Sequence, residues 1–158
     1  MQNETNGQKH AVEIARQKKM KIALVAAPFD ASMVIEVLDN IDLLALNETE
    51  AKELEVAFGK PVESMDGPSI LVTKGAAGAT LITPKQTFHV EGKKVRPRDT
   101  TGAGDTFFGF LLASLIAGKT HQMSLELANE AAAIAVQRHG AANAIPTMDE
   151  VHKAHSSQ

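Results

Sequence analysis

The chain has 158 residues, and its 16 Lys and Arg against 19 Asp and Glu leave a formal net charge of −3. With 44% hydrophobic and 22% charged residues it has the composition of an ordinary globular protein, and its length suits one domain. The mild acidity and the absence of Trp and Tyr argue against nucleic-acid binding, and the absence of Cys excludes disulfides and Cys-based zinc sites. The Lys pairs at 18–19 and 93–94 extend to no basic patch, so both are predicted to be solvated charges.

Short apolar runs alternate with helical periods along the chain, which is typical of an α/β domain. In chain order, the pattern predicts a helix over 11–19, a strand over 21–26, a helix over 32–38, a strand over 43–46, a helix over 49–58, strands over 69–73, 79–83 and 87–90, and helices over 104–117, 125–138 and 148–155. We expect a single domain over 1–158, with 156–158 frayed.

No segment predicts a membrane span. The best candidate, 107–118, is about half of the ~20 apolar residues that a bilayer requires. Residues 1–6 are polar and lack the basic-then-apolar pattern of a signal sequence. We therefore expect a cytoplasmic protein with neither a membrane nor a nucleic acid as partner.

The sharpest chemical signal is the segment Asp-Thr-Thr-Gly-Ala-Gly-Asp-Thr-Phe over 99–107. Three small residues, Gly102, Ala103 and Gly104, precede a long apolar helix, so their N–H groups can surround an anion at the positive end of that helix. Asp105 in the first turn would repel the anion, which makes sense if its carboxylate accepts a proton from an attacking hydroxyl. The alternative is a flexible loop followed by a first-turn helix charge, and the residues by themselves favour neither.

A second polar segment, over 47–50, directly follows the strand predicted over 43–46. Asn47 and Glu50 have the spacing of a helix-capping pair, and taken alone the segment favours this simple interpretation. Alternatively, both side chains lie at the carboxyl edge of a parallel strand, where ligands bind in open α/β sheets. Their oxygens would then suit a hydrated Mg²⁺ ion.

A third segment, Thr-Lys-Gly-Ala-Ala-Gly over 73–78, connects two predicted strands. It is either a hairpin connection in which a glycine takes a positive φ, or a turn that brings bare backbone against a nucleotide. It is not a Walker loop, because the spacing Gly-x-x-x-x-Gly-Lys-Ser/Thr occurs nowhere in the chain.

Together and in this order, the three segments resemble the C-terminal half of a ribokinase-type (PfkB-family) carbohydrate kinase. The resemblance runs from about residue 4 to residue 151, and the Asp-Thr-Thr-Gly-Ala-Gly-Asp-Thr-Phe segment is a highly specific signature of that family. It implies a three-layer α/β/α ribokinase-like fold without its N-terminal half and lid. It also implies that ATP phosphorylates a hydroxyl of a small sugar.

The resemblance further implies roles for individual residues. Asp105 would be the catalytic base, the backbone of 102–104 would hold the transferring phosphoryl oxygens, and Asn47 and Glu50 would organise Mg²⁺, through water, and the ATP phosphates. The nucleotide would be lined by Thr73, Lys74, Gly75, Ala76, Ala77 and Gly78, with Asn129 near the adenine. A K⁺ ion, which many members bind, would be held by Asp99, Thr101, Ala135, Arg138, Gly140 and Ala144.

Three departures from the family pattern matter, and one of them is that Phe108 and Phe110 replace residues that are usually smaller in the family signature. Ala144 stands where members often have a hydroxyl, so one ligand of the K⁺ ion would be lost, which argues against K⁺ dependence. The chain also starts at what resembles the end of a family strand, where Glu4 would face the acceptor sugar, and the sugar-binding segment and lid would be missing.

A sheet cut open in this way exposes an apolar edge and face. We therefore expect a chain that is marginally stable alone, or that is covered by a missing N-terminal half or by a second copy in a homo-oligomer. Two alternatives to an active sugar kinase follow: a module that binds nucleotide without phosphorylating sugar, and a self-associating remnant of a truncated gene.

Overall fold

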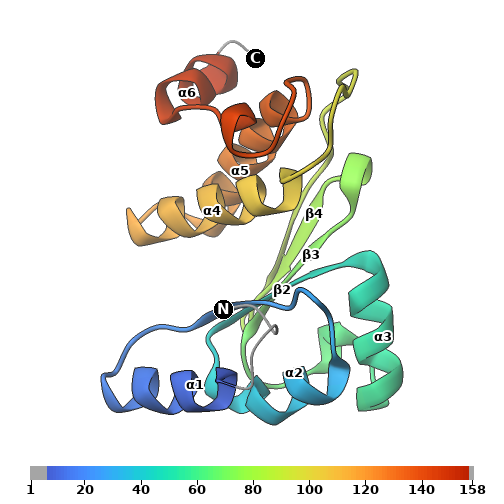
Figure 1. The fold of residues 1–158 in the computed structure, drawn as a ribbon, viewed down its shortest axis with the longest axis vertical. Coiled ribbons are helices and arrows are strands. Elements are labelled where there is room, and N and C mark those ends of the chain that lie inside the picture. The colour runs from blue at the N-terminus through green and yellow to red at the C-terminus, as the bar shows by residue number, and fades with distance from the viewer. Residues whose placement is uncertain (1–6, 157–158) are drawn as a thin grey trace. The chain divides into compact units, whose positions relative to one another are not determined.

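The computed structural model describes residues 7–156, and the chain divides into two compact units (Figure 1). Unit 1 comprises the chain up to Thr73 together with Leu81–Thr87. Unit 2 comprises Lys74–Thr80 and the chain from Phe88 onward. Glu4 lies outside the described residues, as do 157 and 158, and the single partial domain expected from the sequence stays a prediction.

All the predicted helices and strands are present. The helices are α1 (Gln8–Gln17), α2 (Ala31–Val37), α3 (Glu48–Phe58), α4 (Ala103–Ile116), α5 (His121–Ala135) and α6 (Met148–Ser156). The strands are β1 (Ala23–Val25), β2 (Leu43–Asn47), β3 (Ser69–Thr73), β4 (Ala79–Ile82) and β5 (Thr87–Val90). The largest difference is at α5, which begins four residues before its predicted start because the side chain of Thr120 caps it, accepting a hydrogen bond from the N–H of Met123 (3.2 Å).

The strands form one sheet in the order β1-β2-β3-β4-β5. The pairs β1–β2 and β2–β3 are parallel, and Asn47 lies opposite Thr73 in the register. Since β3 and β4 are neighbours joined by only the residues 74–78, too few for a crossover between parallel strands, they run antiparallel. Because β2 and β3 are parallel, their carboxyl ends lie at the same edge of the sheet.

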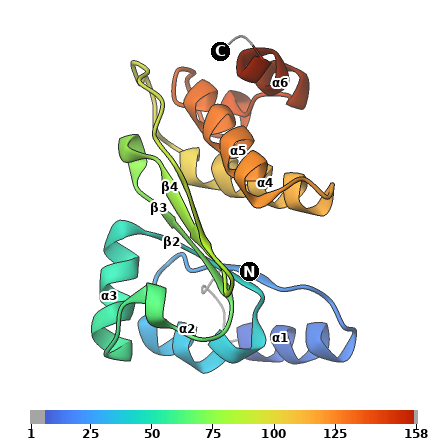
Figure 2. The same cartoon turned by 180° about the vertical axis from the view of Figure 1, so that it is seen from behind.

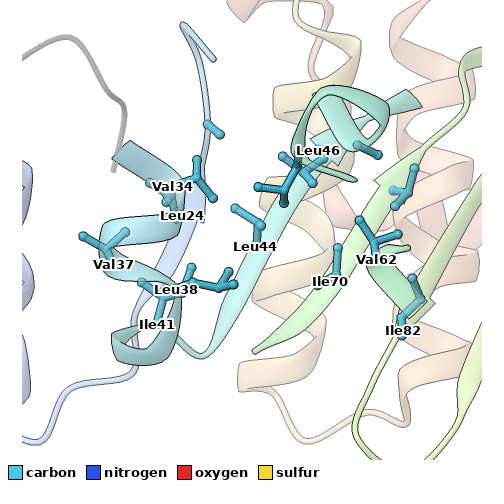
Figure 3. Packing of buried hydrophobic residues seen from close by; sticks show 14 of the residues in the cluster. Leu24, Val34, Val37, Leu38, Ile41, Leu44, Leu46, Val62, Ile70 and Ile82 are labelled. Atoms are coloured by element: carbon cyan, nitrogen blue, oxygen red, sulfur yellow. The ribbon is translucent and has the colours of Figure 1, made fainter. Parts of the chain in front are cut away.

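An apolar core holds unit 1 together (Figure 3). Leu24 of β1, Leu44 of β2 and Ile70 of β3 are almost fully buried and pack in one cluster with Val34 of α2 and Leu54 of α3. Full burial of a side chain of this size stabilises a fold by about 1.5–3 kcal/mol. This core fixes the strands against their helices, and so places the polar ends of β2 and β3.

Unit 2 is built around α4 and α5, which pack along each other, while α6 lies against α5 (Figure 2). Leu127 and Ala131 of α5 form a buried cluster with Val151 of α6, and Phe110 of α4 packs against it. The apolar helix α4 is thus packed against α5. Within residues 7–156, no helix combines the length and apolar character needed to cross a bilayer.

Candidate functional site

Gly102 gives the N-terminus of α4 its shape. The residue precedes the helix with a φ of +73°, and a Cβ at this position would lie 3.3 Å from the Cβ of Ala141. Glycine therefore meets both a conformational and a steric requirement. The turn that it makes is closed by the N–H of Ala103, which donates to the carbonyl of Thr100 (3.2 Å).

The same helix end presents free backbone donors. The N–H of Thr106 makes the first helical hydrogen bond, to the carbonyl of Gly102 (2.9 Å). The N–H groups of Gly104 and Asp105 find no acceptor in the part of the chain that the structure describes. Both are available to an anion at the positive end of α4. Sequence reasoning included Gly104 in this site but missed the N–H of Asp105.

The carboxylate of Asp105 lies in the first turn of α4 and is exposed. Its side chain makes no hydrogen bond and no ion pair with any described residue. Since nothing in this part of the chain occupies its oxygens, the carboxylate can accept a proton from a hydroxyl that approaches the helix end.

Asp99 holds the loop before α4 to the turn that follows α5. Its Oδ1 accepts a hydrogen bond from the N–H of Thr101 (2.9 Å), and its Oδ2 accepts one from the N–H of Gly140 (3.0 Å). These hydrogen bonds, that of the Thr101 N–H foremost, lower the pKa of Asp99 to about 2. The carboxylate therefore stays ionised at neutral pH and connects the loop before α4, at Thr101, to the turn after α5, at Gly140.

The structure brings three of the residues predicted to hold K⁺ together: Asp99, Thr101 and Gly140. The ionised carboxylate fits a monovalent cation. The side chain of Arg138 turns instead to Glu150 of α6 (2.5 Å), and hydrogen bonds from Arg138 and Thr147 lower the pKa of Glu150 to about 2.

The last of the predicted K⁺ ligands is Ala144, which is buried and has no side-chain oxygen to offer. Apart from Asp99, a cation here would depend on backbone carbonyls, such as those of Thr101 and Ala135. Within residues 7–156, no cluster of three or more Asp, Glu or His side chains could hold a metal ion.

Asn47 and Glu50 form the capping box that their spacing predicts. The Oδ1 of Asn47 accepts hydrogen bonds from the N–H groups of Thr49 (2.9 Å) and Glu50 (3.0 Å), and the Oε2 of Glu50 accepts one from the N–H of Asn47 (2.8 Å). The capping interpretation is confirmed, and it leaves the Oε1 of Glu50 free of protein donors in the described chain. One carboxylate oxygen at a sheet edge fits Mg²⁺, which keeps most of its waters when it binds protein.

The connection 74–78 is a tight turn, closed by the N–H of Lys74, which donates to the carbonyl of Gly78 (2.8 Å). Gly78 has a φ of +100°, and a Cβ there would lie 2.0 Å from the carbonyl oxygen of Val90. A Cβ on Gly92 would lie 2.0 Å from the carbonyl oxygen of Ala76. The turn and the segment after β5 are thus in direct backbone contact, and a side chain at either glycine would separate them.

Asn129 lies on α5 and is 7% exposed. Its Nδ2 donates to the carbonyl of Glu91 (2.9 Å), which connects α5 to the same segment after β5. Its neighbour Glu130 is also buried, and Lys93 donates to it through Nζ. The expectation that Lys93 is a solvated charge is therefore wrong. Its partner lies 37 residues away in the sequence, so a local pattern could not reveal it.

These features define a class of protein. Free N–H groups at a helix end can hold a phosphoryl group, and an unpaired carboxylate in the same turn can activate a hydroxyl that attacks it. The comparison with known proteins identifies the family. The model of the pfkB family carbohydrate kinases matches residues 6–148, and the chain belongs to this family.

Similar proteins of known sequence or structure include several ribokinases. The ribokinase of Staphylococcus aureus (strain COL) is 33% identical over 154 residues, which cover 90% of this chain and 50% of that protein. The structure of Arabidopsis thaliana ribokinase complexed with ribose and ATP matches 98% of this chain and 54% of its own, with 27% identity and a TM-score of 0.82.

An E. coli protein solved in complex with ATP and Mg²⁺ matches with 26% identity and a TM-score of 0.81, over 95% of this chain and 53% of its own. The predicted α/β class and the ribokinase-like fold are therefore confirmed. The chain spans about half the length of the relatives that it matches.

Proposed function

We propose that this chain is the ATP-binding part of a sugar kinase, which transfers a phosphoryl group from ATP to a hydroxyl of a small sugar. The observation that carries the proposal is the N-terminus of α4. There, the free N–H groups of Gly104 and Asp105 and the exposed carboxylate of Asp105 lie within one helical turn. Family membership and the similarity to a ribokinase solved with ribose and ATP support it.

In this mechanism Asp105 removes the proton from the attacking sugar hydroxyl. The oxygen forms a bond with the γ-phosphorus of ATP, while the bond from that phosphorus to the β–γ bridging oxygen breaks and ADP leaves. Negative charge accumulates on the transferred oxygens, and the free N–H groups of Gly104 and Asp105 stabilise it, while Gly102 and Ala103 form the turn that presents these groups.

The remaining predicted residues are proposed to bind the nucleotide. The turn 73–78 would line it with backbone, and Asn129 would lie near the adenine. Asn47 and Glu50 would hold Mg²⁺ through water, and this ion would neutralise charge on the ATP phosphates. The ATP and Mg²⁺ found together in the similar E. coli structure support this assignment.

We propose that K⁺ contributes little to activity. The carboxylate of Asp99 and the carbonyl oxygens of the neighbouring loop would attract a monovalent cation, but Ala144 supplies no ligand. For the whole protein we propose a cytoplasmic location, where ATP is available, and completion of the sugar site by an N-terminal half or by a second copy. The proposed contact of Glu4 with the acceptor sugar belongs to that part of the site.

The second candidate is a chain that binds nucleotide without phosphorylating sugar. Calorimetric titration with Mg·ATP, followed by measurement of ADP formation with ribose, deoxyribose and fructose, separates the two. Sugar-dependent ADP formation supports the kinase, and saturable binding without it supports the second candidate. A folded chain that neither binds nor turns over ATP, and only self-associates, would refute both.

A further inference from the structure

Helix α5 holds β5 and the segment after it at four successive points. The rings of Phe88 and His121 stack with their centroids 5.0 Å apart, and further contacts follow in the same direction along both elements. They are the hydrogen bonds from Gln122 Nε2 to the His89 carbonyl (3.3 Å) and from Asn129 Nδ2 to the Glu91 carbonyl (2.9 Å), and the ion pair between Lys93 and Glu130. The segment 88–93 therefore runs along α5.

The ion pair at the end of this series is largely removed from water. The side chain of Glu130 is 7% exposed and that of Lys93 is 22% exposed. A buried carboxylate that loses its cation is strongly unfavourable, so Glu130 holds Lys93 in place more firmly than a surface pair would. Together with the Asn129 hydrogen bond, it fixes the backbone of 91–93 against α5.

This fixed backbone touches the turn 74–78 directly. Gly92, between Glu91 and Lys93, lies so close to Ala76 that a Cβ on it would be 2.0 Å from the Ala76 carbonyl oxygen. Gly78 is equally close to the carbonyl of Val90. With no side chain between the two segments to absorb a shift, a movement of 91–93 moves the turn as well.

We propose that Lys93 and Glu130 are positioning residues for the nucleotide: through Gly92, their ion pair fixes the position of the turn 74–78. The inference rests on the proposed role of that turn in nucleotide binding. Neither residue needs to touch the nucleotide. Their effect is on the affinity for ATP, through the backbone of the turn.

The test compares four variants of the full chain. Glu130→Gln keeps the shape of the Glu130 side chain and removes its charge. Lys93→Met approximately keeps the length of the Lys93 side chain and removes its charge. The exchanged pair, Lys93→Glu with Glu130→Lys, restores the attraction. Lys94→Met is the matched control, because Lys94 is exposed and makes no ion pair with any described residue.

The melting temperature of each variant is recorded, and two further quantities are measured. Hydrogen–deuterium exchange, read by mass spectrometry, gives the exchange rate of the amides in the turn 74–78, with the amides of α3 in unit 1 as the reference. Calorimetry gives the Kd of Mg·ATP. We expect Glu130→Gln and Lys93→Met to accelerate exchange in the turn alone and to raise the Kd about tenfold, equivalent to about 1.4 kcal/mol. The exchanged pair should recover most of both effects, and Lys94→Met should change neither.

A purely structural role gives a different pattern: a lower melting temperature with the wild-type Kd for ATP at 20 °C, which would overturn the inference. Unchanged exchange in the turn also overturns it, whatever the wild-type chain binds. If Glu130→Gln does not fold, Lys93→Met decides the question, since Met suits a partly buried position. Faster exchange in a chain whose wild type binds no ATP would refute the proposed function and the effect on affinity, while the control of the turn would stand.

Discussion

Replacing Gly102 with Ala tests the geometry of the α4 N-terminus. A residue with a side chain costs about 1–2 kcal/mol in the left-handed region, and the φ of Gly102 is +73°. The added Cβ also lies 3.3 Å from the Cβ of Ala141, a tight contact that adds to this cost. For a chain of this size, each kcal/mol lowers the melting temperature by roughly 2–4 °C. We expect Gly102→Ala to lower the melting temperature by about 2–8 °C. Unfolding is monitored by circular dichroism at 222 nm, because the chain has no Trp or Tyr for a fluorescence measurement.

The matched control is Gly109→Ala in the same helix. Gly109 lies inside α4 without a positive φ, and nothing lies within 4 Å of a Cβ placed there. Alanine in a helix interior is more stable than glycine by about 1 kcal/mol, so this variant should melt roughly 2–4 °C higher. The reasoning is refuted if Gly102→Ala is as stable as the wild type while Gly109→Ala shows its expected gain.

Three further predictions concern the ends of α3 and α4 and the proposed cation. Asn47→Ala removes the cap of α3, so the free energy of unfolding should fall by about 1 kcal/mol in urea titrations, and an unchanged value would contradict the capping role. Because the folded-state pKa of Asp99 is lowered to about 2, the ionised carboxylate stabilises the fold above its unfolded pKa of about 3.9, and this stabilisation is lost as the pH falls toward 2. The melting temperature of Asp99→Asn should therefore drop less between pH 5 and pH 2 than that of the wild type. An equal drop in the two proteins would count against this role of Asp99. Replacing K⁺ with Na⁺ should change the rate of ADP formation less than about twofold, whereas Ala144→Ser should introduce a K⁺ response; strong K⁺ dependence of the wild type would contradict the proposal.

Local sequence patterns predicted most of the fold for identifiable reasons. The strand predicted over 69–73 is found with the same bounds, because a continuous apolar run bounded by polar residues is what a strand buried on both faces requires. The helix predicted over 49–58 ends where expected, with Gly59 in the left-handed conformation at φ +80°. The beginning of α5 was missed, because Met123 is the one apolar residue in its first turn and only the cap at Thr120 indicates the start of the helix.

The candidate site was predictable where it depends on neighbours in the sequence, and not where it depends on distant ones. The capping box of Asn47 and Glu50 and the tight turn before α4 follow from local spacing. The hydrogen bond from Gly140 to Asp99 joins residues 41 apart. The ion pair between Lys93 and Glu130 likewise depends on packing that only the folded chain reveals.

The most direct test of the central claim compares wild type with Asp105→Asn. The substitution keeps the size of the side chain and removes the base, which contributes about 10²–10⁴-fold to rate in general base catalysis. ADP formation with the best sugar substrate is measured beside the calorimetric Kd of Mg·ATP on the same preparations. We predict sugar-dependent turnover by the wild type, reduced at least about a hundredfold in Asp105→Asn, with the Kd changed less than about threefold. Equal turnover by the two proteins would contradict the account.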